Sequence, residues 1–429
     1  MGSAFHTLAL GGRLQDTLEQ KDRAGSVLTL DRNALGDVAF AANRGFLLDY
    51  GSELEAYVAE LQHILEVKSS TLVFGGRYQS GTVEAHSWSK LTPGAFPGPF
   101  VYPTTDPHVE ANIERFSVYA YEYWQLLDSV QLTAGLAYDR LVYPVNSEIT
   151  PVSAGQQDRD QVSPKVGIRY QPFPDTILRG AYTRSLGGVY YDTSVRLEPT
   201  QVAGFNQTFR SLIPESLVGL VPGSRFETWG LALDQKFKTG TYVTMLGEVL
   251  RSRADRSVGV FERTFGVVQA APSATPEHLD YHENSASLVV NQLLDDFWSL
   301  SASYRFSEAV LHDRFPVIPV AVNAAAQADS TSHLQQVHLF VHFNHPSGCF
   351  GQLGSVWSAQ SNQGFVAGLA GDDFWQFNAL MGYRFLQRRA EASIGVLNFT
   401  DRNYQLHPLN LYSELPRERT FVASVKFNF

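Results

Sequence analysis

Apolar and polar residues alternate with a period of two along much of the chain. The stretches VQLTAGLAYD (130–139), WSLSASYRF (298–306) and WQFNALMGYRF (375–385) each place mainly apolar or aromatic residues at every second position. Successive side chains of a strand point to opposite faces, so this pattern predicts β-strands. Many of these stretches run for about ten residues, longer than the roughly five or six of a globular sheet. About nine to eleven residues is the length with which a tilted strand crosses a bilayer.

The links between the predicted strands alternate in length. Short links such as KSS (68–70) and PFPD (172–175) alternate with long ones such as 87–110 and 188–223. Short turns on one side and long loops on the other are typical of outer-membrane barrels. The predicted strands lie near 5–15, 52–66, 70–86, 111–126, 129–144, 160–171, 176–187, 224–237, 240–258, 279–293, 296–310, 331–344, 348–362, 371–386, 389–400 and 418–429.

The pattern therefore predicts an all-β fold, a transmembrane antiparallel up-and-down β-barrel of about 16 strands, which form one barrel domain over 1–429. Residues 16–51 could form a hairpin within one long external loop or two further spanning strands, which would give 18. We favour the loop. The alternative fold is a soluble β-sandwich or propeller, since alternation alone also fits a sheet packed on a core. Aromatic residues near the strand ends favour the membrane barrel, where they form interfacial girdles.

Composition narrows the function. Charged residues make up 18% of the chain and the formal net charge is -10, which argues against a nucleic-acid partner because such a partner needs a basic surface. Cys349 is the only cysteine, so no disulfide can form within the chain. The first twenty residues lack the basic and apolar regions of a secretory signal, and no run of about 18 apolar residues predicts a membrane-spanning helix.

Three stretches resemble the β-barrel of TonB-dependent receptors, outer-membrane proteins of Gram-negative bacteria that import scarce solutes. GVLNFTDRNYQL (395–406) is similar to the penultimate-strand signature of that family, and ELPRERTFVASVKFNF (414–429) to its final loop and last strand. QVSPKVGIRYQPFPDTILRGAYTRSL (161–186) resembles its mid-barrel hairpin. The resemblance implies binding of a siderophore, cobalamin, a sugar or a similar solute at extracellular loops for TonB-dependent uptake.

The family pattern also includes parts that we do not find in this sequence. Its barrels have about 22 strands and a lumen filled by a plug domain that contacts TonB. The sequence begins within a predicted strand, so we expect a barrel that is incomplete at its N-terminus and lacks the plug domain. A passive porin-like channel or structural barrel without coupled transport is the alternative. The expected partners are outer-membrane lipid, the barrel-insertion machinery and a small solute, with TonB only if a plug is supplied elsewhere.

The longest link, 187–223, is the candidate ligand-binding loop on the extracellular side. Links longer than about 12 to 15 residues are usually functional or disordered. Aromatic rings beside amide and guanidinium groups suit a polar ligand that contains rings. The alternative is a structural lid folded over the mouth of the lumen. The candidate contacts are Tyr190, Tyr191, Arg196, Phe205, Asn206 and Arg210.

Two further sets of residues follow from the barrel prediction. Basic residues on the inward face could line a path for anionic solutes, or could pair with inward carboxylates such as Asp139 and Asp234 across neighbouring strands. The apolar row of the last strand ends on an aromatic residue, which in the resembling family is part of the signal read by the barrel-insertion machinery. The lumen-lining set is Lys165, Arg169, Arg305, Arg384 and Lys426, and the insertion set is Phe421, Val425, Phe427 and Phe429.

We predict no enzymatic activity and no cofactor. The sequence has no Gly-x-Ser-x-Gly, His-Glu-x-x-His or phosphate-binding glycine motif. His338 and His342 share a strand face, but four residues along a strand span roughly 13 Å, too far for two imidazoles on one metal ion. We therefore predict no metal site.

Overall fold

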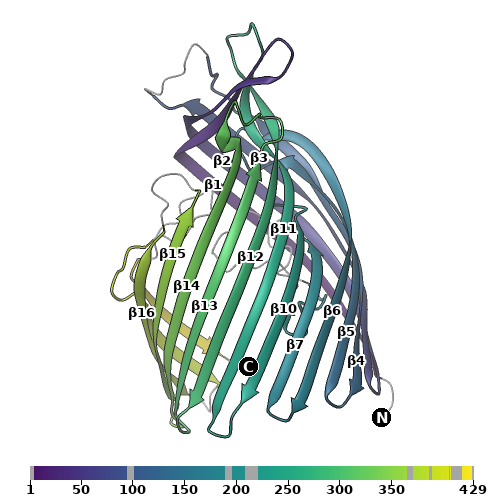
Figure 1. Ribbon diagram of the computed structural model, residues 1–429, viewed down its shortest axis with the longest axis vertical. Coiled ribbons are helices and arrows are strands. Elements are labelled where there is room, and N and C mark those ends of the chain that lie inside the picture. The colour runs from purple at the N-terminus through teal and green to yellow at the C-terminus, as the bar shows by residue number, and fades with distance from the viewer. Residues whose placement is uncertain are drawn as a thin grey trace.

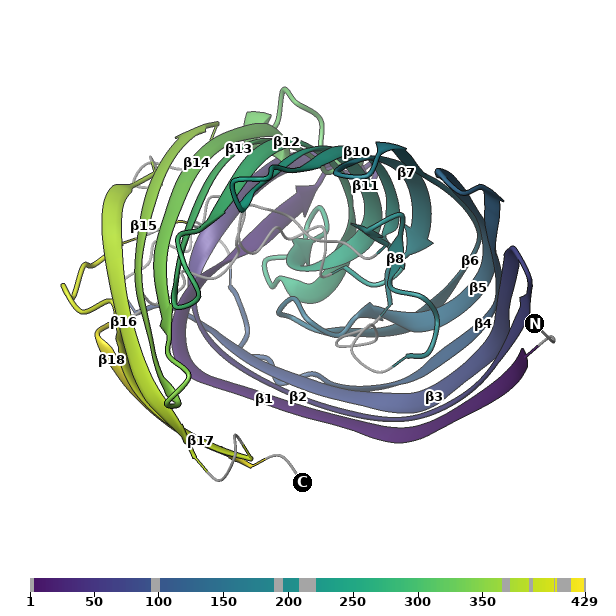
Figure 2. The same cartoon turned by 90° about the horizontal axis from the view of Figure 1, so that it is seen from below.

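The computed structural model describes residues 4–93, 101–188, 196–207, 221–364, 371–385, 389–404, 406 and 418–427. Their strands form one 16-stranded sheet that curls into a barrel (Figure 1, Figure 2). Neighbours in the sheet follow one another along the chain and pair antiparallel, as in an up-and-down barrel. The predicted fold class and the count of sixteen strands are confirmed.

The strand bounds agree with the predicted ones over most of the chain. A two-stranded hairpin, β8 (Gln201–Val202) and β9 (Phe205–Asn206), lies outside the main sheet, and the short 3-10 helix η2 spans Ala324–Ala326. The sheet strands are β1 (Ala4–Arg32), β2 (Val38–Val67), β3 (Ser70–Leu91), β4 (His108–Leu127), β5 (Val130–Asn146), β6 (Ser153–Phe173), β7 (Thr176–Leu186), β10 (Arg225–Lys236), β11 (Thr241–Arg263), β12 (Ala271–Leu293), β13 (Trp298–Arg314), β14 (Gln327–Asn344), β15 (Cys349–Gln363), β16 (Asp373–Phe385), β17 (Ala390–Leu397) and β18 (Thr420–Phe427).

Residues 16–51 form one hairpin, as favoured, and not two further spanning strands, but they are paired strand and not a loop around a separate hairpin. They continue β1 and β2, which are 29 and 30 residues long and meet in a turn at 33–37. Charged residues interrupt the alternation of this stretch, which hid its continuity with the flanking strands. A bilayer needs only about nine to eleven residues of a tilted strand, so this hairpin reaches far beyond the hydrocarbon layer.

The two faces of the sheet have inverted polarity compared with a soluble protein. On the outer face apolar side chains are exposed, among them Leu136 at 53%, Val166 at 57% and Met381 at 64%. On the inner face polar and charged side chains such as Gln161 and Arg115 are buried. This is the alternation that a lipid-facing wall around a polar lumen requires.

The connections are short at one end of the barrel and long at the other. The links after β2, β4 and β6 span only 68–69, 128–129 and 174–175. The link between β7 and β10, which are neighbours in the sheet, spans 187–224. Figure 1 shows the short turns at the lower end and the long hairpins at the upper end. We call the upper end the outer mouth.

The edges of the sheet do not meet as the sequence suggested. In a closed up-and-down barrel the last strand pairs with the first, but β18 pairs with β17 and, among the described residues, no pair joins it to β1. Instead Leu28–Asp31 of β1 pair in parallel with Val260–Arg263 of β11 and close a ring at the outer mouth. Within the described ranges, no helix is both long and apolar enough to span a membrane.

Candidate functional site

The long link between β7 and β10 turns into the barrel. β7 and β10 have 11 and 12 residues, about half the length of their neighbours β6 and β11, with 21 and 23. The wall is therefore low at this point, and the middle described part of the link, 196–207, lies inside the barrel, where Figure 2 shows β8. We call residues 196–207 the inner loop. Because it folds against the inner wall, it occupies part of the lumen.

Glycines of the wall make room for the β8–β9 hairpin. A Cβ atom on Gly167 of β6 would lie 2.6 Å from the Val202 side chain, and one on Gly230 of β10 would lie 2.1 Å from the Phe205 ring. Both side chains are buried, at 0% and 2% exposure. The Arg179 guanidinium lies 5.6 Å from the Phe205 ring centroid on its way to Asp234, which it contacts at 2.7 Å. The hairpin is thus seated in the wall rather than laid over it.

We expect Gly230→Ala to loosen the inner loop. The added methyl would overlap the Phe205 ring, which is buried and cannot move aside without shifting the hairpin. Hydrogen exchange at 201–207 should become faster while the barrel strands stay protected. The matched control is Gly180→Ala on the paired strand β7, where the nearest atom to the new methyl would be 3.4 Å away. Equal exchange in the two variants would contradict this account.

A carboxylate on the wall receives the backbone of the inner loop. Glu60 of β2, 4% exposed, accepts the amide N–H groups of Leu197 at 2.8 Å and Glu198 at 2.9 Å. Tyr119 of β4 donates its hydroxyl to the same carboxylate at 2.8 Å. Gln62 also donates to the Leu197 carbonyl, at 2.6 Å. Charge-assisted bonds of this kind are stronger than neutral ones and fix the loop in one position.

A second carboxylate, that of Glu198 on the inner loop, makes contacts with side chains of the wall. Glu198 accepts from Lys165 of β6 at 3.0 Å and from the hydroxyl of Tyr121 of β4. Arg196 lies 3.7 Å from its other oxygen. The side chains of Lys165 and Glu198 are 4% and 13% exposed, so this pair is shielded from water. We call Glu60, Tyr119, Tyr121, Lys165 and Glu198 the latch.

The latch makes the seating of the inner loop dependent on pH. Burial would raise the pKa of Glu198, but the positive charges of Lys165 and Arg196 outweigh it and lower the pKa from 4.5 to about 2. A group with a lowered folded-state pKa stabilises the fold above its unfolded value, and this contribution disappears as pH falls toward the folded value.

We therefore expect the loop to loosen between pH 4.5 and about 2. Protease cleavage within the inner loop, followed across this range, should accelerate as Glu198 takes up its proton. In Glu198→Gln, which cannot titrate, this acceleration should be absent. A wild-type profile that stays flat would count against the role of Glu198.

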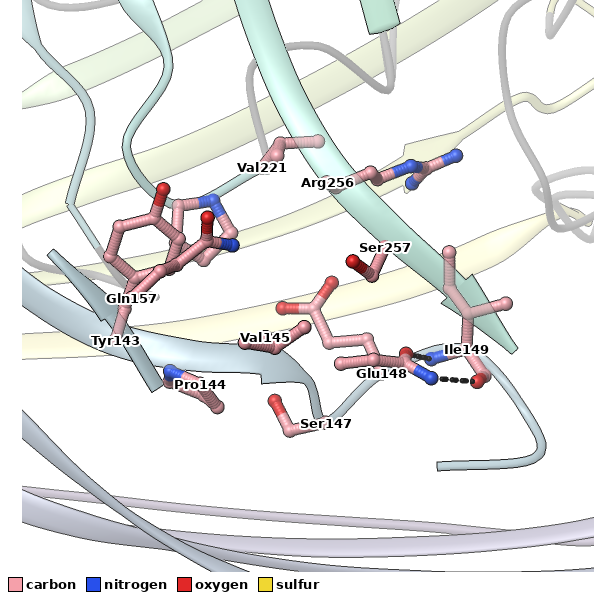
Figure 3. A pocket seen from close by; sticks show the side chains of 12 residues that line it. Tyr143, Pro144, Val145, Ser147, Glu148, Ile149, Gln157, Val221, Arg256 and Ser257 are labelled. Atoms are coloured by element: carbon pink, nitrogen blue, oxygen red, sulfur yellow. Dashed lines mark hydrogen bonds between the residues drawn. The ribbon is translucent and has the colours of Figure 1, made fainter. Parts of the chain in front are cut away.

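A small cavity lies above the inner loop, toward the outer mouth. Figure 3 shows its lining from the β5–β6 link, the end of the β7–β10 link and β11, with Tyr143, Glu148, Val221, Arg256 and Ser257 around it. Its volume is about 30 Å³, room for one or two water molecules and too little for an organic solute. It belongs to the packing between the outer end of β5 and β11.

About the first half of the sequence matches the profile of a known family. Residues 4–216 match the profile of the family described as TonB dependent receptor-like, beta-barrel. Over these residues the chain belongs to the β-barrel of the TonB-dependent receptor family. Barrels of this family reside in the outer membrane of Gram-negative bacteria and serve as transporters or receptors.

Solved structures of TonB-dependent receptors share this fold at low identity. The copper transporter OprC superposes with a TM-score of 0.55 at 14% identity over 99% of this chain and 68% of its own. BauA, the ferric preacinetobactin receptor from Acinetobacter baumannii, gives 0.54 at 11%, over 100% of this chain and 60% of its own. FyuA, the ferric yersiniabactin uptake receptor from Yersinia pestis, gives 0.52 at 12%, over 90% and 55%. The chain thus spans between about half and two thirds of their length. No curated protein matches the sequence.

The candidate ligand contacts fall partly within the inner loop of this TonB-dependent receptor barrel. Arg196 faces Glu198 with a side chain 11% exposed. Phe205 is buried, with its ring against Gly230. Asn206 is half-buried on β9 and accepts from Gln201 at 3.3 Å. Tyr190, Tyr191 and Arg210 lie outside the described residues. Ligand contact by any of the six stays a prediction.

The predicted lumen-lining residues lie on the inner face or at its lower end. Lys165 belongs to the latch, and Arg169 shares its face of β6. Arg305 lies on the same face of β13 as the buried Ser307, near Glu248 and Glu283. The other two lie near the short turns, where Arg384 pairs with Glu391 at 2.8 Å and Lys426 is exposed on β18. A role in guiding solutes remains a prediction for all five.

The predicted insertion residues lie on the last strand. Phe421, Val425 and Phe427 are 76%, 63% and 55% exposed on one face of β18, and Phe429 lies outside the described residues. Recognition by the insertion machinery stays a prediction. Elsewhere, the described residues contain no cluster of three or more His, Cys, Asp or Glu side chains arranged to hold a metal ion.

Of the latch residues, only Lys165 was predicted from the sequence, as a lumen-lining residue. Glu60, Tyr119, Tyr121 and Glu198 come from β2, β4 and the inner loop, and no local motif joins them. The only sequence signals were the apolar residues of the long link and the glycines at 167 and 230, which mark places where another segment approaches the strand closely.

Proposed function

We propose that this chain forms the barrel of an outer-membrane receptor that takes up a scarce solute through its lumen. The inner loop is the observation that carries the proposal. A segment with aromatic, amide and guanidinium groups is held inside a polar lumen by charged side chains of the wall. A solute that enters from the outer mouth meets this loop before it can reach the lower end. Arg196 and Asn206 are the described candidates for contact with it.

Uptake by the family is coupled to TonB, and this coupling is part of the proposal. The barrel supplies the lumen and the outer loops, while TonB acts only if a plug domain is supplied. The other proposed partners are outer-membrane lipid, which would cover the exposed apolar face, and the barrel-insertion machinery, which would read the last strand. The net charge of -10 gives no support to a nucleic-acid partner.

Saturable binding of a solute tests the proposal. Protein folded in detergent, verified by heat-modifiable mobility, is titrated with ferric catecholate and ferric hydroxamate chelates, cobalamin, copper ions and oligosaccharides while tryptophan fluorescence is recorded. We expect one class to bind saturably to the wild type. In a variant with residues 196–207 replaced by a glycine-serine segment of equal length, this binding should be lost. Ion conductance without saturable binding of any probe would instead support a passive channel.

A further inference from the structure

The outer part of the β1–β2 hairpin crosses the barrel. Leu28–Asp31 of β1 pair in parallel with Val260–Arg263 of β11, although seven strands, β2 to β7 and β10, separate the two in the sheet. In Figure 2 the purple end of this hairpin leaves the wall and runs across the interior toward β11, and in Figure 1 it meets the β11–β12 hairpin at the top. We call residues 23–48 the lid.

A β-bulge marks the start of the lid. The register between β1 and β2 shifts between Gln20 and Arg23, and Asp22 adopts a positive φ of 51°. The Asp22 amide donates to the Asp49 carboxylate at 2.6 Å, which holds the bulge. Bulges bend a strand and increase its twist. The change of direction at 20–23 thus has a local cause in the backbone.

Two reciprocal ion pairs fasten the lid to β11. Arg32 contacts Glu262 through two nitrogens at 2.8 and 3.2 Å, and Arg263 contacts Asp31 at 2.6 Å. The four side chains are between 14% and 27% exposed. Partly exposed pairs of this kind contribute modestly and can separate into water, unlike fully buried ones.

The lid has further contacts, both polar and apolar. Residues 46–48 pair with β3, Arg44 donates to the Tyr102 hydroxyl at 3.1 Å, and Asn323 of the β13–β14 link donates to the Ala41 carbonyl at 3.3 Å. The Phe46 ring stacks on the Phe261 ring at 5.0 Å, and Leu30 packs with Val260 and with Ile318 of the β13–β14 link. Detaching the lid from β11 would break its contacts with Val260 and Phe261 and a ladder of four residue pairs. Moving it outward would also break its contacts with the β13–β14 link. The antiparallel ladder between β1 and β2 would stay intact, since it uses the other edge of β1.

We propose that the lid is a gate over the outer mouth, which opens by bending at 20–23 and releasing both β11 and the β13–β14 link. The inference rests on the proposed function, because a solute bound for the inner loop must enter past the lid. The closed position is the one described. The open position keeps the hairpin and exposes the side chains between lid and β11.

Thiol accessibility tests the motion without any solute. Two variants are made in a Cys349→Ser background. Leu30→Cys places a thiol on the buried side of the lid, at a position 2% exposed, and Leu35→Cys places one at the tip of the lid, 87% exposed. Reversing the charges of one side, with Glu262→Arg and Arg263→Glu, should speed maleimide modification at position 30 and leave it unchanged at 35. Reversing Asp31 and Arg32 as well, to Arg and Glu, should restore slow modification.

A buried thiol elsewhere separates lid opening from unfolding. Leu141→Cys lies 1% exposed on β5, away from the lid, and its modification should stay slow in all charge variants. Equal rates at position 30 with and without the charge reversal would overturn the proposal, as would faster modification at 30 and 141 together. These rates stand or fall independently of solute binding, so they distinguish failure of the gate from failure of the proposed function.

A disulfide lock tests the consequence for entry. Asp31→Cys with Arg263→Cys, also in the Cys349→Ser background, replaces one ion pair by a covalent link between lid and β11. Asp31→Cys with Phe40→Cys links the same position to β2 within the lid and leaves it free to move. The readout is saturable binding of the chelate, cobalamin, copper ion or oligosaccharide that binds the wild type. Oxidation should abolish this binding in the first variant, reversibly on reduction, and leave it unchanged in the second. Unchanged access to the oxidised first variant would refute the gate.

Discussion

Leu136→Arg should destabilise the bilayer-folded protein by about 2–4 kcal/mol, the cost of an arginine facing lipid near the midplane of a barrel. Leu136 lies on the outer face of β5, 53% exposed, six residues from the start of the strand at the short turn. Denaturant unfolding in phospholipid vesicles, monitored by tryptophan fluorescence, gives the free energy of unfolding. In a water-soluble sheet the same exposed change would cost little, typically within about 0.5 kcal/mol.

The control places the same charge beyond the bilayer. Val267 is 48% exposed in the link between β11 and β12 at the outer mouth, so Val267→Arg replaces a side chain of similar exposure by the same arginine in water. Its free energy of unfolding should match that of the wild type. If the two variants are equally stable, the outer face of β5 does not face lipid.

The strands and the orientation of their two faces could be predicted, because within each strand apolar residues mark the lipid-facing side and polar residues mark the lumen-facing side. Along β13 the row Trp298, Leu300, Ala302 faces outward and the serines between face inward, and this period of two is visible without any tertiary contact. The strand pattern was less informative at the outer ends of several strands. Charges break the alternation at residues 16–51, and β6 and β12 begin at Ser153 and Ala271, before the predicted 160 and 279.

Contacts across the lumen could not be predicted in the same way. A charged residue on the inner face of a wide barrel has the same sequence pattern whether it faces water or a folded loop. Glu60 and Glu198 lie 138 positions apart, yet the carboxylate of one accepts the amide N–H of the other. The lid meets β11 through Arg32 and Glu262, which are 230 positions apart. Such pairs depend on how the hairpins bend, which strand periodicity does not encode.

The latch gives the second large effect. Glu198→Ala leaves the ammonium group of Lys165 buried at 4% exposure without its carboxylate, and breaking a buried pair on one side costs about 3–5 kcal/mol. The protein can avoid this cost by releasing the inner loop into the lumen, because the barrel strands do not depend on it. We expect faster protease cleavage in the inner loop, while heat-modifiable mobility of the barrel remains.

Removing both charges together separates the contribution of the Lys165–Glu198 ion pair from that of the other contacts of the inner loop. With Lys165→Met and Glu198→Leu no charge of the pair remains unpaired, and apolar replacement of a buried ion pair is often neutral or stabilising. Glu60 still accepts hydrogen bonds from the amides of Leu197 and Glu198, and the Phe205 ring still packs against Gly230. The double variant should therefore be cleaved nearly as slowly as the wild type. If it is cleaved as fast as Glu198→Ala, the carboxylate of Glu198 holds the loop through Tyr121 and Arg196, and Lys165 contributes little.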